Sequence, residues 1–288
     1  MGRVNTSDRA MLGVVILRRH RVLPPKGVLL VSTDLHGNLD DFEVLHARFE
    51  GALDAGADVH WALLGDLVHG PDPATAAAEP ELYGYVDRSP ELIDALFSVQ
   101  QAHPERVHVV LGNHDAGHVG LEHTSKFHPD EVEALEARLS DVQRGRLEQL
   151  LGDALLLMLA PCGLVLSHGS GGDAVTSLAV LDGPLRSEAR DEHTRAVNEL
   201  LWSYGQLGEV TARLLSRLSE QTGLSLHVVV HGHDRDPSGW FIEGGNQVQP
   251  VIFGALPQNK RYLWLDLGCR YLSPDDLREG HEVLRLHG

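Results

Sequence analysis

Side chains that bind metal ions or transfer protons collect at five points of the sequence. Each point follows a short apolar run and sets glycine beside acid, amide or imidazole groups. The five motifs are Asp34-Leu35-His36-Gly37-Asn38, Gly65-Asp66-Leu67-Val68, Gly112-Asn113-His114-Asp115, Ser167-His168-Gly169 and His231-Gly232-His233-Asp234. Carboxylate oxygens mixed with imidazole nitrogens suit manganese, iron or zinc, and the absence of thiolates argues against a structural zinc site. These residue types therefore predict a catalytic metal centre.

The apolar run before each motif has the length and composition of a buried β-strand. The predicted strands cover residues 27–33, 59–64, 107–111, 163–167 and 226–230. In α/β sheets, functional side chains gather where the strands end, so the five motifs can meet at one site. Helical spacing over residues 39–55, and a helix start at Ser89-Pro90-Glu91 with Ser89 as the N-cap, predict two helices between the first three strands.

Later segments predict the remainder of an α/β fold. Helices are expected at 129–139, 141–151, 190–202 and 209–220, and further strands at 154–160, 248–253 and 261–267. We expect one domain over residues 1–288, with its core at about 27–267 and helical excursions at about 117–152 and 170–222. His69, His118 and His123 are expected at the surface or behind the ligands.

The composition restricts the partners and the compartment. With 42% hydrophobic residues the chain can bury a core, and its formal net charge of −17 disfavours binding to nucleic acid or an anionic membrane. A phosphorylated substrate remains compatible if metal ions supply local positive charge. Cys162 and Cys269 are too few for a disulfide framework, and no stretch approaches the roughly 18 apolar residues of a membrane span. We therefore expect a cytoplasmic protein.

The set of motifs resembles the calcineurin-like metallophosphoesterases and, within them, the Ser/Thr phosphoprotein phosphatase family. Two further segments are similar to that family, Leu200-Leu201-Trp202-Ser203 and Phe253-Gly254-Ala255-Leu256-Pro257. The resemblance covers about residues 27–267 and rests on the five motifs in the expected order, each after a predicted strand. It implies a four-layer α/β/β/α sandwich with two mixed β-sheets.

The resemblance also implies two divalent metal ions, with manganese as first choice and iron or zinc as alternatives. The first metal is expected on Asp34, His36 and Asp66. The second metal is expected on Asp66, Asn113, His168 and His233. Asp66 is therefore expected to bridge the two metals. His231 is expected either as an additional ligand or as a group that supports the ligands.

In the family, the histidine that corresponds to His114 acts on the leaving oxygen as a general acid or charge stabiliser. It needs a carboxylate partner to stay protonated at neutral pH. The family motif reads Gly-Asp-x-x-Asp-Arg-Gly, whereas this chain reads Gly65-Asp66-Leu67-Val68-His69-Gly70. The partner aspartate is thus replaced by His69, and the phosphate-binding arginine is missing.

Other residues are candidates for these two missing roles. Asp115, the chain neighbour of His114, is the candidate for its carboxylate partner. Arg186 is the candidate for phosphate binding, because it lies between two motifs where the family carries another phosphate-binding arginine. Arg195 and Arg235 are the substitutes for it.

The leading interpretation is a metal-dependent phosphatase that hydrolyses phosphomonoesters by attack of a metal-bridging hydroxide. Phosphoserine and phosphothreonine are the first-choice substrates, because the Trp202 and Phe253 segments resemble protein phosphatases. The first alternative is a symmetrical diadenosine tetraphosphatase or another nucleotide phosphohydrolase, because Gly65-Asp66-Leu67-Val68 followed by Gly70-Pro71 resembles that branch too. The second alternative is a non-catalytic metal-binding regulatory protein. The complete ligand set argues against it, because unused buried charges are costly.

Overall fold

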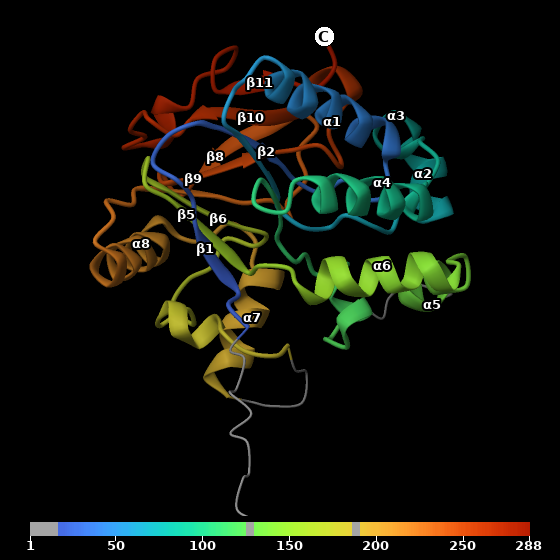
Figure 1. Cartoon of the computed structure of the whole chain (residues 1–288), viewed down its shortest axis with the longest axis horizontal. Coiled ribbons are helices and arrows are strands. Elements are labelled where there is room, and N and C mark those ends of the chain that lie inside the picture. The colour runs from blue at the N-terminus through green and yellow to red at the C-terminus, as the bar shows by residue number, and fades with distance from the viewer. Residues whose placement is uncertain (1–16, 125–129, 186–190) are drawn as a thin grey trace, which may run out of the picture.

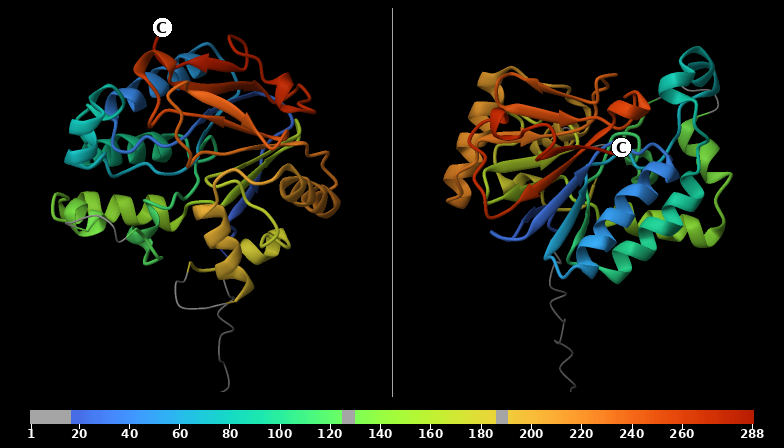
Figure 2. Two further views of the ribbon diagram at one scale, coloured as in Figure 1. Left: turned by 180° about the vertical axis from the view of Figure 1, so that it is seen from behind. Right: turned by 90° about the horizontal axis from the view of Figure 1, so that it is seen from above.

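The computed structural model describes residues 17–124, 130–185 and 191–288. Two mixed β-sheets pack face to face, with helices outside them (Figure 1 and Figure 2). The five-stranded sheet has the order β11 (Val283–Arg285), β10 (Arg261–Asp266), β2 (Val28–Ser32), β3 (Val59–Leu63) and β4 (Val107–Val109). The six-stranded sheet has the order β1 (His20–Val22), β5 (Leu157–Ala160), β6 (Leu164–Ser167), β7 (Val228–Val230), β9 (Gln247–Pro250) and β8 (Trp240–Glu243).

Within each sheet, the strands that precede the motifs run parallel to one another. In one sheet β2, β3 and β4 are parallel, and in the other β6 pairs parallel with β7. Their carboxyl ends therefore lie together at one edge of each sheet. Strands β10 and β11, and the β5–β6 and β8–β9 pairs, add the antiparallel ladders that make both sheets mixed.

In the central strand β2, apolar side chains lie on both faces, as expected for a strand buried on two sides. In β2, Leu29 and Val31 belong to the apolar layer between the sheets, whereas Leu30 belongs to the layer under the helices. Trp61 of β3 also faces the helices, and the ring centroids of Phe42 and Phe49 lie 5.4 and 5.8 Å from its own. This packing fixes the sheet against its outer helices.

Helices form the two outer layers. The five-stranded sheet is covered by α1 (Leu39–Asp54) and α4 (Ser89–Ala102), whereas α7 (Glu192–Trp202) and α8 (Gly208–Thr222) flank the six-stranded sheet. The other helices and 3₁₀ turns are α2 (Pro73–Ala78), α3 (Pro80–Tyr83), α5 (Glu131–Glu136), α6 (Asp141–Gly152), η1 (Ala116–Val119), η2 (Leu178–Leu181), η3 (Pro257–Asn259) and η4 (Pro274–Asp276). The predicted four-layer sandwich with two mixed sheets is confirmed. Within the described ranges no helix has both the length and the apolar composition to cross a membrane.

One predicted helix start is wrong in detail. The N-cap of α4 is Arg88, which makes no side-chain cap, and Ser89 lies in the first turn. The Ser89 hydroxyl instead accepts a hydrogen bond from the backbone N–H of His69 at 3.1 Å and donates one to Asp87. The sequence pattern predicts that Ser89 caps this helix, but its side chain bonds instead to the loop after β3.

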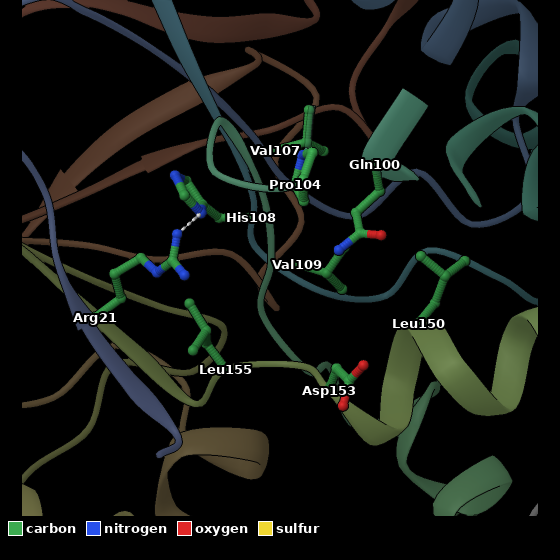
Figure 3. A pocket seen from close by; sticks show the side chains of 9 residues that line it. All are labelled: Arg21, Gln100, Pro104, Val107, His108, Val109, Leu150, Asp153 and Leu155. Carbon is green, nitrogen blue, oxygen red and sulfur yellow. Dashed lines mark hydrogen bonds between the residues drawn. The ribbon is translucent and has the colours of Figure 1, made fainter. Parts of the chain in front are cut away.

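The edges of the two sheets are joined on one side by a polar contact (Figure 3). Arg21 of β1 donates a hydrogen bond from its guanidinium to His108 Nδ1 in β4 at 3.3 Å, and His108 Nε2 lies 3.2 Å from His60 Nδ1. Burial, with the Arg21 cation beside it, lowers the pKa of His108 to about 3. These neutral imidazoles satisfy one another, so we assign this cluster a structural role.

Candidate active site

The loops that follow β2, β3 and β4 are hydrogen-bonded to one another. The backbone N–H groups of Asp34 and His36 donate to the carbonyls of Gly65 and Asp66, at 3.1 and 2.9 Å. The N–H of His114 donates to Asp66 Oδ1 at 2.9 Å. These bonds hold three of the five motifs in one fixed arrangement.

The motifs of the second sheet join the same arrangement. The N–H of Gly232 donates to the His168 carbonyl at 2.9 Å, and the N–H of His233 donates to the Asp34 carboxylate at 3.1 Å. The Leu200-Leu201-Trp202-Ser203 segment supports the His168 loop, because its Leu200 carbonyl accepts from Gly169 N–H at 2.6 Å. All five motifs therefore meet at one place.

The backbone of these loops is strained. Among the described residues, five that are not glycine have positive φ angles, and all five belong to the loops at this site: Asp34, His36, Asp66, His69 and His233. Left-handed backbone at such residues costs free energy and tends to persist where surrounding contacts or function require it. The distribution marks this end of the sandwich as the functional site.

Asp66 lies at the centre of the site. Its Oδ2 atom is 3.5 Å from His36 Nε2 on one side and 3.5 Å from His168 Nε2 on the other. Two groups of ligand atoms, each within 4.8 Å of one another, could hold a metal ion, and both contain Asp66. They are His36, Asp66 and His114, and Asp66, His168 and His233.

The tautomers of two imidazoles direct lone pairs toward Asp66. His36 Nδ1 donates to the His69 carbonyl at 2.8 Å, and His168 Nδ1 donates to the Leu64 carbonyl at 2.8 Å. In a neutral imidazole the other nitrogen, Nε2, then carries a lone pair. Both lone pairs face the same carboxylate oxygen. The two nitrogen atoms and this oxygen atom repel one another unless a cation lies between them. The donor set therefore fits metal ions.

The other predicted ligands complete the same cluster. Asn113 Oδ1 lies 2.8 Å from His168 Nε2 and 2.8 Å from His233 Nδ1. Burial, and His168 beside it, lower the pKa of His233 to about 3, so the ring is neutral and able to ligate a metal. Through these contacts the structure brings His36, Asp66, Asn113, His168 and His233 together. Asp34 lies outside both groups of ligand atoms and joins the site through the hydrogen bond from His233 N–H to its carboxylate.

The site shifts the pKa values of the two carboxyls among the predicted ligands in opposite directions. Burial and the neighbouring Asp66 carboxylate raise the pKa of Asp34 well above its usual range. Burial also acts to raise the pKa of Asp66, but the imidazoles of His168, His114 and His36 outweigh it and hold that pKa well below its usual range. A divalent cation would offset the repulsion between the two carboxylates.

Glycine at position 112 makes room for the central carboxylate. A Cβ atom added to Gly112 would collide with both the backbone nitrogen and the Oδ1 atom of Asp66. Any side chain at position 112 would therefore displace the Asp66 carboxylate from its place between the histidines. Position 112 of the Gly112-Asn113-His114-Asp115 motif therefore requires glycine for steric reasons.

His231 lies outside both groups of ligand atoms. Its ring is fully buried, and its Nδ1 donates to the Gly232 carbonyl at 3.0 Å. Burial lowers its pKa to about 3. Of the two roles considered for His231, the geometry supports the one behind the ligands.

The carboxylate in contact with His114 is Glu131, which the sequence did not single out. His114 Nδ1 lies 2.9 Å from Glu131 Oε2 of α5, and both side chains are nearly buried. Burial alone would lower the pKa of His114, but the carboxylates of Asp66 and Glu131 outweigh it and raise that pKa.

The structure places Asp115 elsewhere than expected. Its carboxylate accepts hydrogen bonds from the backbone N–H groups of Leu67 at 2.9 Å and Gly112 at 3.1 Å, and so it ties the second motif to the third. Burial and the Asp66 carboxylate raise the pKa of Asp115 to about 7. The hydrogen bonds to these backbone amides hold the Asp115 carboxylate away from His114. The contact expected for Asp115 is made by Glu131 instead.

His69, at the sequence position of the family's partner aspartate, also turns away from His114. The His69 and His114 ring centroids are 6.5 Å apart. His69 Nε2 instead lies 2.9 Å from His118 Nε2, and His118 Nδ1 lies 3.3 Å from Glu136. Both histidines are behind the ligands, one of the two placements expected for them.

The missing arginine at position 70 has a steric reason. A Cβ atom on Gly70 would lie 2.5 Å from the Cβ of Asp87, so no larger side chain fits there. Among the candidate substitutes, Arg186 lies outside the described residues, and Arg195 is exposed on α7. Arg235 is nearer to the site, because its guanidinium carbon lies 4.9 Å from the Phe253 ring centroid. That ring packs on His36 with centroids 3.9 Å apart.

Comparison with known proteins agrees with this geometry. Residues 27–237 match the calcineurin-like phosphoesterase family. A solved protein serine/threonine phosphatase from Saccharomyces cerevisiae is 16% identical, with a TM-score of 0.55 over 85% of this chain and 75% of that one. A cold-active protein-tyrosine phosphatase from a psychrophilic Shewanella species is 12% identical, with a TM-score of 0.57 over 87% and 78% of the two chains. At this identity the two structures show a shared fold alone. The match over most of the length decides the family: the chain belongs to the calcineurin-like phosphoesterases.

Proposed function

We propose that this chain is a metal-dependent phosphatase that hydrolyses phosphomonoesters, with phosphoserine and phosphothreonine in proteins as its first substrates. The observation that carries the proposal is the position of Asp66 Oδ2, 3.5 Å from an imidazole nitrogen on each side and shared by two groups of ligand atoms. Such an arrangement is suited to holding two cations close together. The family match supports phosphoester hydrolysis as the reaction.

The proposed ligands follow from the contacts described above. One metal would be held by His36 and Asp66 together with Asp34, which lies outside the two groups of ligand atoms but whose carboxylate accepts a hydrogen bond from the N–H of His233. The other would be held by Asp66, Asn113, His168 and His233. Manganese is our first choice, with iron or zinc as alternatives, because the donors are carboxylate, amide and imidazole. When bound, two such cations supply positive charge for the phosphate oxygens and acidify the attacking water.

The chain's own residues then act on the substrate around this centre. We assign His114 to the leaving oxygen, to which it gives a proton as the ester bond breaks. Its ring belongs to the first group of ligand atoms, so it lies beside the place where a phosphate would bind. We assign Arg235 to the phosphate, since its stem packs against Gly254 and its guanidinium lies over the Phe253 ring.

Replacing Arg235 with glutamine should lower kcat/KM for phosphomonoesters about ten- to hundredfold, mainly through KM, because a charged hydrogen bond to phosphate is lost. Arg270→Gln is the matched control, because Arg270 is exposed and follows β10 at the end of the sheet where β2 begins. Steady-state kinetics on p-nitrophenyl phosphate checks this. Unchanged kinetics in Arg235→Gln, with a loss in Arg195→Gln, would move the role to Arg195.

One observation favours the nucleotide phosphohydrolase as a second candidate. Tyr204 is 64% exposed although its ring centroid lies 4.7 Å from that of His233. An exposed aromatic ring beside a metal-ligand cluster offers a face on which a nucleotide base can stack. A diadenosine polyphosphate would use this face, whereas a phosphoserine peptide has no base to place there.

A panel of substrates tests the proposal. The purified chain, supplied with manganese, is assayed on p-nitrophenyl phosphate, its bis-ester, phosphoserine peptides and diadenosine tetraphosphate. We expect the highest kcat/KM on the phosphopeptides. Preference for diadenosine tetraphosphate, lost in Tyr204→Ala, would establish the second candidate instead. Bound metal without turnover of any substrate would overturn both and leave a non-catalytic metal-binding protein.

A further inference from the structure

We infer that Glu131 of α5 is the positioning residue for His114, a role that neither Asp115 nor His69 fills in this chain. The inference rests on the proposed phosphatase function, in which His114 acts on the leaving group. It concerns a residue that lies 17 positions after His114 and outside all five sequence motifs.

The contact itself is short and shielded from solvent. Glu131 Oε2 accepts from His114 Nδ1 at 2.9 Å, and the exposed fractions of the two side chains are 9% and 13%. The other oxygen of Glu131, Oε1, is buried without a hydrogen-bond partner among the described residues. A buried carboxylate with an unsatisfied oxygen is a poor device for stability, because desolvation of the charge is costly. Its presence at this point is better explained by what it does to His114.

The segment that carries Glu131 is docked on the histidine loop by two more contacts of the same kind. Asp130 Oδ2 lies 2.9 Å from His123 Nε2, and Glu136 Oε1 lies 3.3 Å from His118 Nδ1. Three carboxylates within seven residues thus face three histidines of the loop after β4. Glu131 is the one of the three that reaches the imidazole at the metal-ligand cluster.

The His114 ring bridges Glu131 and the cluster. One of its ring nitrogens belongs to the group in which the ligand atoms of His36, Asp66 and His114 lie within 4.8 Å of one another. Its ring centroid is 4.9 Å from that of His36. The hydrogen bond from Nδ1 to Glu131 therefore fixes the ring's tilt at the position where a leaving oxygen would stand.

The step that Glu131 supports is the departure of the alcohol. The attacking water gives one proton to solvent as its oxygen forms a bond to phosphorus, and the bond from phosphorus to the ester oxygen breaks with its electron pair on that oxygen. His114 gives the ester oxygen a proton, so the products are the alcohol and phosphate. Glu131 keeps the ring oriented through Nδ1 and does not itself exchange the proton.

The test compares Glu131→Gln with Glu133→Gln, an exposed glutamate on the same helix. Two substrates are used, phenyl phosphate with a poor leaving group and p-nitrophenyl phosphate with a good one. We expect Glu131→Gln to lower kcat about tenfold or more on phenyl phosphate and about threefold or less on p-nitrophenyl phosphate, with KM unchanged. Glu133→Gln should behave as wild type. Retained turnover of p-nitrophenyl phosphate shows that Glu131→Gln is folded.

A double-mutant cycle then decides whether Glu131 acts through His114. His114→Asn alone should cost about a hundredfold on phenyl phosphate, and adding Glu131→Gln should cost nothing more. Additive losses, or an equal loss on both substrates, would overturn the inference while the phosphatase function stands.

A measurement independent of turnover separates the two proposals. In protein labelled with ¹⁵N-histidine, the His114 Nδ1–H signal, identified by its loss in His114→Asn, should move in Glu131→Gln and stay in place in Glu133→Gln. A wild-type chain that hydrolyses no phosphomonoester would sink the proposed function. An unmoved Nδ1–H signal in Glu131→Gln would overturn the inference by itself.

Discussion

Removal of divalent metal from the purified chain should abolish the phosphatase activity that we propose for it, and adding manganese should restore that activity. The reason is the donor set at Asp66, where two imidazole lone pairs and two buried carboxyls face one another. Without metal ions the buried carboxylates of the site would repel a phosphate dianion, and nothing would acidify the attacking water. We expect elemental analysis to find two transition-metal ions per chain.

Metal removal should also lower the thermal stability of the protein. An ion that binds only the folded chain stabilises it by about 2.7 kcal/mol at a concentration a hundredfold above its dissociation constant. The melting temperature should therefore fall on chelation and recover with manganese. The chelator is dialysed away before each measurement, so that it cannot act on the added metal. Full activity in protein shown to be free of metal would contradict the prediction.

The positions of the ligands could be predicted from the sequence because their signal is local. An apolar run that ends in Asp, Asn or His beside glycine marks a strand and the loop after it, and parallel strands bring such loops together. Asp34, Asp66 and His168 each follow a strand in this way, and the structure brings them to one site. Long amphipathic helices such as α1 could also be predicted, from the helical spacing of their apolar residues.

Glu131 could not be found in this way, because only tertiary packing selects it. The chain has 41 acidic residues, and nothing in the local pattern of 129–139 distinguishes this one from its neighbours. The substitution of His69 for the family's aspartate indicated that a partner was missing. It did not indicate that His69 would turn to His118, or that α5 would fold over His114. Asp115 is the neighbour of His114 in the sequence, but in the structure its carboxylate binds backbone amides instead of the imidazole.

The short edge strands β8 and β11 escaped prediction for a related reason. They contain four and three residues, and β8 is only partly buried, so neither presents the apolar run that marks a central strand. The reason that position 70 holds glycine instead of arginine could not be predicted from the sequence either. The steric block comes from Asp87, a residue distant in sequence. In each case the deciding partner belongs to another element.

Asp66→Asn should lower turnover at least about a thousandfold, and should cost more than Asp34→Asn. Asparagine has the shape of aspartate, and its Oδ1 can still accept the hydrogen bond from His114 N–H that Asp66 accepts at 2.9 Å. What is lost is a unit of negative charge at the one side chain common to both groups of ligand atoms. Asp34 belongs to neither of those two groups, so its replacement should disturb one metal at most.

The comparison needs both kinetics and metal content. Turnover of p-nitrophenyl phosphate and elemental analysis are measured for wild type, Asp66→Asn, Asp34→Asn and the control Asp141→Asn, whose carboxyl is fully exposed on α6. We expect Asp141→Asn to match wild type and Asp66→Asn to lose metal as well as turnover. If Asp66→Asn retained two metals and near-normal turnover, the charge that holds the metals together would have to come from elsewhere. Because Asp34 is the other carboxyl among the predicted ligands and is also buried, a larger loss in Asp34→Asn would then transfer the bridging role to it.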